Sequence, residues 1–123
     1  MTEQTLQSRI KNEFEQQGWY AAHLSPPNHP GFPDLLLAKD GYVLLVEIKD
    51  FSKIGPKEKF SALFQEAQMP FYLKMIKHGC PVLIIGNLGD NVLRITMALQ
   101  DMVTDSFLLG RDSYLSQYAE NYY

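Results

Sequence analysis

The chain has 123 residues, of which 46% are hydrophobic and 12% aromatic, enough to build the core of one compact domain and too apolar for a disordered chain. Eleven Lys and Arg residues against fourteen Asp and Glu residues give a formal charge of −3, so the overall charge does not by itself indicate a nucleic-acid partner. The longest apolar runs are far shorter than the ~20 residues that span a bilayer, and the first residues lack a signal-peptide pattern. We therefore expect a cytoplasmic protein with no membrane association.

The first predicted element is an amphipathic helix. Leu6, Ile10 and Phe14 recur at helical spacing, and Gly18 follows as a stop signal. Glu13 lies beside this apolar stripe, where its carboxylate either faces inward along the rim of the core or is simply solvated. The spacing alone favours the solvated state.

A predicted strand over 19–24 and an irregular Pro-rich loop over 25–33 lead to a hairpin. Asp40-Gly41 separates two apolar runs, 35–38 and 42–48, and Asp-Gly in this position is typical of a two-residue type I′ turn. Both runs are continuous and not alternating. This part of the sheet is therefore expected to be covered on both faces.

The hairpin register brings two carboxylates together. With a two-residue turn, Leu35 lies opposite Val46, and Asp34 lies opposite Glu47. Directly opposed side chains have Cβ atoms about 5 Å apart, and like charges at that distance repel by about 3 kcal/mol at an effective dielectric of 20. A divalent cation would relieve this repulsion, because Mg²⁺ is commonly held by one or two carboxylates plus water and phosphate oxygens.

Lys49 completes this candidate site. Strand alternation puts it on the same face as Glu47, so an ammonium lies beside the proposed metal. In phosphodiester hydrolysis, such a Lys positions the attacking water or stabilises the developing negative charge. Each residue taken alone is better explained by a salt bridge at a sheet end. The convergence of Asp34, Glu47 and Lys49 through one register favours the site.

A basic, turn-rich segment and a second helix follow. Lys53, Lys57 and Lys59 are candidates for phosphate binding, although a solvated loop explains the composition equally well. The helix is expected to begin near Ala67 or Gln68, with Pro70 in its first turn, because an interior proline would remove a backbone hydrogen bond; the alternative is a longer helix that is kinked at Pro70. This start would direct the Gln68 side chain towards the end of the sheet.

The C-terminal third is predicted to contain two strands, over 81–86 and 92–96, and then two helices, over 98–109 and 113–122. Tyr114, Tyr118 and Tyr122 recur at helical spacing in the last of these. Such a stripe usually packs on the domain itself and less often forms a dimer contact.

Taken together, these motifs resemble the PD-(D/E)xK nuclease superfamily, and in particular its virus-type replication-repair nuclease (VRR-NUC) branch. The resemblance rests on Gly31-Phe32-Pro33-Asp34-Leu35, then Glu47-Ile48-Lys49, and then Gln68 in a helix that ends at Gly79. It covers about residues 1–96, which we expect to form the nuclease core, with 97–123 as a C-terminal helical extension of the same domain.

The resemblance implies an α/β fold, with a mixed sheet in a restriction-endonuclease-like αβββαβ core and helices on both faces. It implies that Asp34, Glu47, the backbone carbonyl of Ile48 and Glu13 bind Mg²⁺ or Mn²⁺. Lys49 corresponds to the catalytic lysine of the family, and Gln68 to a glutamine that supports the site. Stand-alone members of this branch resemble phage proteins that act as homodimers on branched DNA.

The sequence thus favours a metal-dependent DNA endonuclease, selective for junction DNA and homodimeric, with Lys53, Lys57 and Lys59 as its DNA-binding residues. One alternative is a module that binds DNA junctions or a replication partner without cutting. The carboxylate pair argues against it, because the pair's repulsion would be costly without a cation. Another alternative is a nuclease subunit whose DNA affinity comes from a partner protein.

Overall fold

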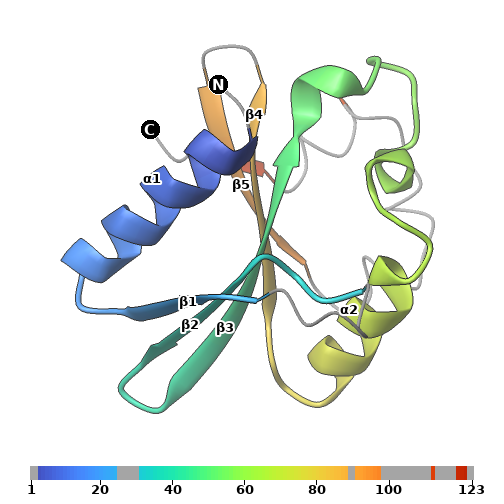
Figure 1. Cartoon of the computed structure of the whole chain (residues 1–123). Coiled ribbons are helices and arrows are strands. Elements are labelled where there is room, and N and C mark those ends of the chain that lie inside the picture. Colours follow the sequence, from blue (N-terminus) through green and yellow to red (C-terminus); the bar gives the residue numbers. More distant parts are fainter. Residues whose placement is uncertain (1–2, 25–30, 89–90, 98–111, 113–118, 122–123) are drawn as a thin grey trace.

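The computed structural model describes residues 3–24, 31–88, 91–97, 112 and 119–121. Within these residues, six strands form one mixed sheet in the order β1-β2-β3-β4-β5-β6 (Figure 1). Every neighbouring pair is antiparallel except β3 and β4, which run parallel. The elements are α1 (Glu3–Gln16), β1 (Tyr20–His23), β2 (Leu35–Lys39), β3 (Tyr42–Asp50), the 3₁₀ helices η1 (Phe51–Lys53) and η2 (Phe60–Leu63), α2 (Gln68–Lys77), β4 (Val82–Leu88), β5 (Asn91–Met97) and β6 (Ala119–Asn121).

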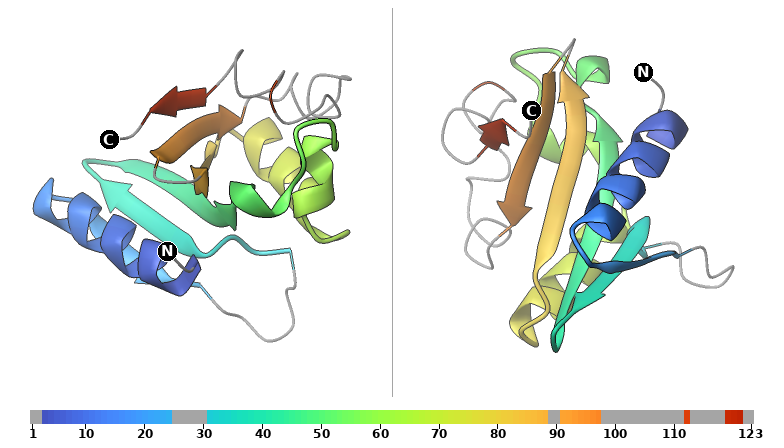
Figure 2. Two further views of the ribbon diagram at one scale, coloured as in Figure 1. Left: turned by 90° about the horizontal axis from the view of Figure 1, so that it is seen from above. Right: turned by 90° about the vertical axis from the view of Figure 1, so that its left-hand side faces the viewer.

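The two α-helices cover opposite faces of the sheet, as Figures 1 and 2 show. Leu6, Ile10 and Phe14 of α1 are buried in one apolar cluster with one set of strand side chains. Tyr72 of α2 belongs to a second cluster, with the alternate strand residues such as Leu45. This three-layer arrangement confirms the predicted mixed α/β fold with helices on both faces.

The β2–β3 hairpin has the predicted turn and register. Asp40 and Gly41 both have positive φ angles, 52° and 85°, as a type I′ turn requires. The ladder runs from Lys39 opposite Tyr42 to Leu35 opposite Val46. Beyond that pair, the backbone of residue 34 bonds to β1, because its carbonyl accepts the N–H of Leu24 at 2.9 Å. The ladder between β2 and β3 ends at Leu35 and Val46, one pair before the predicted pairing of residues 34 and 47.

The helix boundaries also agree with the sequence analysis. The first helix ends before Gly18, whose φ of +92° is the left-handed conformation that favours glycine at a helix terminus. The second begins at Gln68, with Ala67 at the N-cap, so Pro70 lies in the first turn. Gly79 follows that helix with a φ of +85°.

The prediction of a helix over 113–122 is wrong for residues 119–121, which form β6. They pair antiparallel with β5 and so obtain backbone hydrogen-bond partners from the sheet. Pairing of this kind overrides a helical spacing of side chains, because it depends on distant residues. The predicted helix over 98–109 and the tyrosines Tyr114, Tyr118 and Tyr122 lie outside the described residues. No helix within the described ranges is long and apolar enough to cross a membrane.

Candidate active site

The second half of β3 carries a buried carboxylate. Side chains alternate along the strand, so Val46 and Ile48 face α1, whereas Leu45, Glu47 and Lys49 face α2. Glu47 is only 2% exposed. Burial of a carboxylate is costly unless it is hydrogen-bonded or paired with a cation, so its contacts indicate what the site is built to hold.

Asp34 is brought to this position by the segment that precedes β2. A Cβ atom on Gly31 would lie 2.5 Å from the carbonyl oxygen of Ala67, so only glycine allows this segment to approach the start of α2 so closely. The next residue, Phe32, packs its ring against that of Phe71, with centroids 4.6 Å apart. Asp34 then accepts a hydrogen bond at Oδ2 from the backbone N–H of Ile48, at 2.7 Å.

Two side chains of α2 bind one oxygen of Glu47. Gln68, through Nε2, and Tyr72, through its hydroxyl, both donate hydrogen bonds to Oε2 of the carboxylate. The two residues are four positions apart and hence on the same side of the helix. They are also the two most buried residues of α2, whereas Phe71 and Met75 are only partly buried.

Lys49 is connected to the carboxylate through the same glutamine. Its ammonium donates to Oε1 of Gln68 at 3.1 Å, and the backbone N–H of Gln65 donates to that oxygen at 2.8 Å. The amide of Gln68 therefore accepts from the lysine and donates to Glu47. Lys49 also lies over the ring of Phe64, 5.0 Å from its centroid.

The pKa of Glu47 is raised from 4.5 to about 9. Burial is the main cause, and the hydrogen bond and negative charge of neighbouring Asp34 act in the same direction. The Tyr72 hydroxyl and the Lys49 ammonium lower this pKa but do not outweigh the other effects. The pKa of Tyr72 is raised as well, first by burial and then by the charge of Glu47. Without a cation, the two carboxyl groups therefore keep a proton between them near neutral pH.

The carboxylate pair fits a magnesium-type ion. Mg²⁺ uses one or two carboxylates and retains several waters, and a cation would relieve the repulsion that raises the pKa of Glu47. Among the described residues, no group of three or more His, Cys, Asp or Glu side chains could hold a metal. The candidate donors are thus Asp34 and Glu47, with the backbone of Ile48 between Glu47 and Lys49.

Glu13 is not brought to this cluster. It lies on α1, which covers the opposite face of the sheet, and its carboxylate is 3.6 Å from Nε of Arg9. The acid of α1 that reaches the active strand is Glu3, whose Oε1 accepts the backbone N–H of Asp50 at 3.0 Å. A stripe-edge position could not distinguish these two acids, because it does not say which turn of the helix lies beside the end of β3.

The three candidate DNA-binding lysines, Lys53, Lys57 and Lys59, are exposed. They belong to the stretch from η1 to η2, which connects the end of β3 to α2 on the α2 side of the sheet (Figure 1). Phe64, just after η2, reaches Lys49. The basic stretch and the carboxylate pair therefore belong to the same side of the molecule.

Sequence reasoning missed Tyr72 and Phe64 as members of the site. The signal for Tyr72 was its position one helical turn after Gln68, at i+4 on the same face. Phe64 carried no comparable signal, because it follows an irregular segment whose path depends on tertiary packing.

No family model matches the chain, and no curated protein matches it in sequence. Among solved structures, it is similar to Hjc of Archaeoglobus fulgidus, a Holliday junction resolvase from an archaeal hyperthermophile. The two share 13% sequence identity with a TM-score of 0.55, over 80% of this chain and 73% of that one. At this identity, the likeness shows the fold, and it agrees with the predicted restriction-endonuclease-like architecture.

Proposed function

We propose that this chain is a metal-dependent endonuclease that hydrolyses phosphodiester bonds of DNA. The observation that carries the proposal is the buried carboxyl of Glu47, whose pKa is raised to about 9, first by burial and then by the neighbouring Asp34. Lys49 is held beside this pair through Gln68. A buried carboxylate pair of this kind costs stability unless a cation is bound. The presence of this pair at the end of the sheet, beside the Lys49 ammonium, is therefore better explained by a catalytic role than by a structural one.

Asp34 and Glu47 would hold Mg²⁺ or Mn²⁺, with the carbonyl of Ile48 as a further ligand by the family resemblance. When bound, the ion polarises a phosphoryl oxygen and lowers the pKa of a water molecule. Lys49 stabilises negative charge that develops on the phosphate or orients the attacking water. Gln68 keeps the lysine and Glu47 in fixed relative positions, because it hydrogen-bonds to both.

The proposed substrate is branched DNA, cut by a homodimer. The structural likeness to a Holliday junction resolvase supports this, as does the resemblance to the phage-like, stand-alone form of the VRR-NUC branch. The exposed Lys53, Lys57 and Lys59 would bind the phosphate backbone. The second candidate is a subunit that receives its DNA affinity from a partner, which the formal charge of −3 favours.

Cleavage of labelled single-stranded, duplex, flap and four-way-junction DNA tests the proposal. Wild type should cut in Mg²⁺ or Mn²⁺ and not in EDTA. Glu47→Gln preserves the size of the side chain and should abolish cutting, whereas Glu15→Gln, at an exposed position on α1, should leave it unchanged. Metal-dependent binding to one DNA structure without cutting would contradict the nuclease proposal and favour the alternative, a module that binds DNA without cutting it. Cutting that appears only with added cell extract would favour the partner-dependent subunit.

The role of the basic stretch is tested separately. Replacement of Lys53, Lys57 and Lys59 by Ala should weaken DNA binding and lower the slope of log K against log salt by about 0.9 for each phosphate that the variant no longer neutralises. Lys11→Ala, on α1, is the control, because that lysine pairs with Glu15 on the other side of the sheet. An unchanged slope in the triple variant would exclude this stretch as the phosphate-binding surface.

A further inference from the structure

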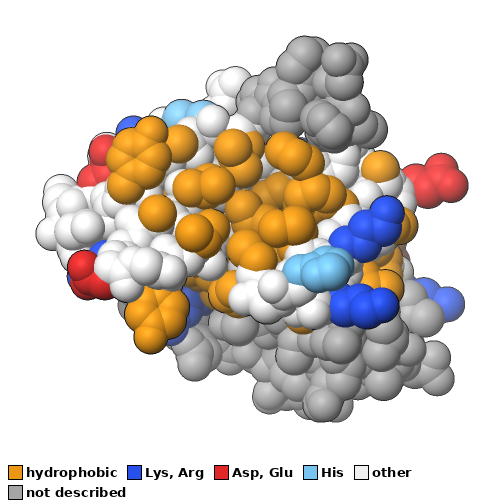
Figure 3. Space-filling view, turned by 90° about the horizontal axis from the view of Figure 1, so that it is seen from below, with side chains coloured by type: hydrophobic (Ala, Val, Ile, Leu, Met, Phe, Trp, Pro, Cys, Tyr) orange, Lys and Arg blue, Asp and Glu red, His pale blue; other side chains and the backbone are white. Residues whose placement is uncertain are grey.

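The end of the molecule that contains the β2–β3 turn is apolar. Figure 3 shows a continuous hydrophobic area there, which we call the hairpin pole and define by six residues. Tyr42 and Val43 in this pole are 74% and 45% exposed, which is unusual for large hydrophobic side chains at the start of a central strand. The pole consists of Trp19, Tyr42, Val43, Leu44, Cys80 and Pro81.

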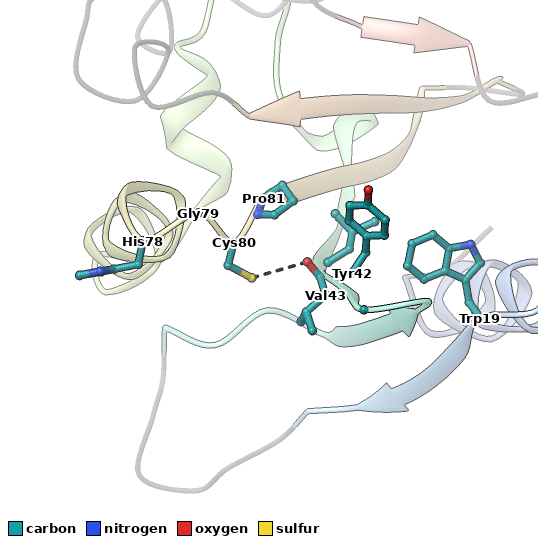
Figure 4. Close-up of a pocket in the computed structure, with 9 residues that line it drawn as sticks. Trp19, Tyr42, Val43, His78, Gly79, Cys80 and Pro81 are labelled. Atoms are coloured by element: carbon teal, nitrogen blue, oxygen red, sulfur yellow. Dashed lines mark hydrogen bonds between the residues drawn. The ribbon is translucent and has the colours of Figure 1, made fainter.

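The pole contains a pocket of about 550 Å³ (Figure 4). It forms because β3 and β4 pair only from Leu45 and Val82 onwards, so the residues before them diverge. In Figure 4, Trp19 lies at one side of this space, and the chain from His78 to Pro81 lies at the other. The Cys80 thiol donates a weak hydrogen bond to the carbonyl of Val43 at 3.9 Å and links the two sides. Pockets of this size accept groups larger than one aromatic ring.

Opposite charges border the pole. Asp40 is exposed in the hairpin turn, two residues before Tyr42. Lys74 and Lys77, in the last turn of α2, and His78 after it are also exposed. Figure 3 shows Lys or Arg side chains and a histidine along one edge of the apolar area. One surface therefore carries a projecting aromatic side chain, a pocket, the carboxylate of Asp40 and a basic border.

We propose that the hairpin pole binds a second copy of this chain across a two-fold axis. In a two-fold interface, each group of one copy meets its complement on the other, so the same patch must contain both members of every pair. The pole meets this requirement twice. The exposed ring of Tyr42 can enter the partner pocket, and the carboxylate of Asp40 can face the basic border around Lys77.

This arrangement leaves both active sites open. Tyr42 and Glu47 are five residues apart on one strand, which places the pole about 16 Å from the carboxylate pair. The inference rests on the pole and does not depend on the nuclease proposal. Together with the nuclease proposal, dimerisation through the pole would give a homodimer that carries two separate active sites.

Sedimentation velocity from micromolar to near-millimolar concentrations tests the proposal. Wild type should dimerise, and Tyr42→Ser combined with Val43→Thr should weaken dimerisation by at least about 30-fold, because buried aromatic anchors dominate interface affinity. Both positions are exposed in the single chain, so the variant should fold, which circular dichroism verifies. Asn12→Ala, on α1 and away from the pole, is the matched control and should behave as wild type.

Charge supplies a second, independent variant. Lys77→Glu should weaken the dimer at low salt, and high salt should reduce this effect, because rim charges are screened. A wild type that stays monomeric throughout would overturn the proposal and assign the pole to a different partner. A dimer that survives the Tyr42 and Val43 substitutions would overturn it as well. A monomeric wild type would also contradict the proposed homodimer, but neither result decides whether the chain cleaves DNA, which the cleavage assay measures separately.

Discussion

The two ends of β3 depart from the usual burial of apolar groups and exposure of polar groups in opposite directions. At the start of the strand, Tyr42 and Val43 are exposed, and at its end Glu47 is buried at 2% exposure beside Lys49. The first departure leaves apolar surface in water, and the second removes charge from water. Each is unfavourable in the isolated chain and would be relieved by the partners that we propose, a second protein surface at one end and a cation at the other.

The contrast also shows how one strand serves two purposes. Its centre, Leu45 to Ile48, is fixed between two layers by α1 and α2. The active end is further held by hydrogen bonds from α2, whereas the hairpin end extends beyond the layers. Rigid support of this kind is what a catalytic constellation requires.

After the loss expected for Glu47→Gln, the next largest effect should come from Lys49→Met, which keeps much of the side-chain volume and removes the charge. We expect cleavage to fall by about 10²–10³-fold, because the variant has no ammonium near the developing negative charge. Single-turnover rates at saturating Mg²⁺ measure this. Lys11→Met, on α1, should change nothing, and a Lys49 variant with near wild-type rates would remove the lysine from the chemistry.

A backbone contact at the active end gives the next prediction. A Cβ atom on Gly86 would lie 2.3 Å from the carbonyl oxygen of Lys49 and 3.0 Å from the ring of Phe51. Gly86→Ala should therefore lower the free energy of unfolding by about 2–3 kcal/mol, as overpacking does. Urea denaturation measures this loss.

Gly55→Ala is the control for that substitution, because the atoms nearest to its new methyl group belong to the flexible side chain of Glu58. It should change stability by less than about 0.5 kcal/mol, as surface substitutions usually do. Equal losses in the two variants would show that β4 does not approach β3 closely at Lys49.

The raised pKa of Glu47 predicts how stability depends on pH. Between its ordinary pKa of 4.5 and its folded value of about 9, the folded state holds a proton that the unfolded state has released. The contribution of this carboxyl group to stability in EDTA should therefore be full below pH 4.5 and be lost as the pH rises towards 9. Glu47→Gln cannot ionise there, so its melting temperature should depend less on pH. Equal pH slopes for the two proteins would contradict the buried carboxyl pair.

Much of the active end could be predicted from local sequence. Asp40-Gly41 determines the turn, the turn determines the register, and strand alternation then puts Glu47 and Lys49 on one face. The start of α2 at Gln68 followed from the position of Pro70. These inferences succeed because each depends on residues close together in the chain.

The remaining features depend on contacts between distant segments. The position of the first turn of α1 beside the end of β3 decides that Glu3 and not Glu13 reaches that strand, and no spacing within the helix encodes this position. The pairing of β6 with β5 likewise replaces a helical pattern around residue 120. The pocket at the hairpin pole arises where β3 and β4 diverge, which the sequence of neither strand specifies alone.

The smallest effect should come from Tyr72→Phe, which removes one hydroxyl and leaves the buried ring in place. Removal of its hydrogen bond to Glu47 should cost about 1 kcal/mol of stability. Because this bond lowers the pKa of Glu47, its removal should raise that pKa further, so the pH-dependent fall in stability should shift to higher pH. Cleavage should decline most near neutral pH, where the carboxylate now binds its proton more tightly, and recover as the pH rises. Tyr20→Phe removes an exposed hydroxyl and should shift neither profile. An unshifted profile in the Tyr72 variant would mean that Gln68 alone positions the carboxylate.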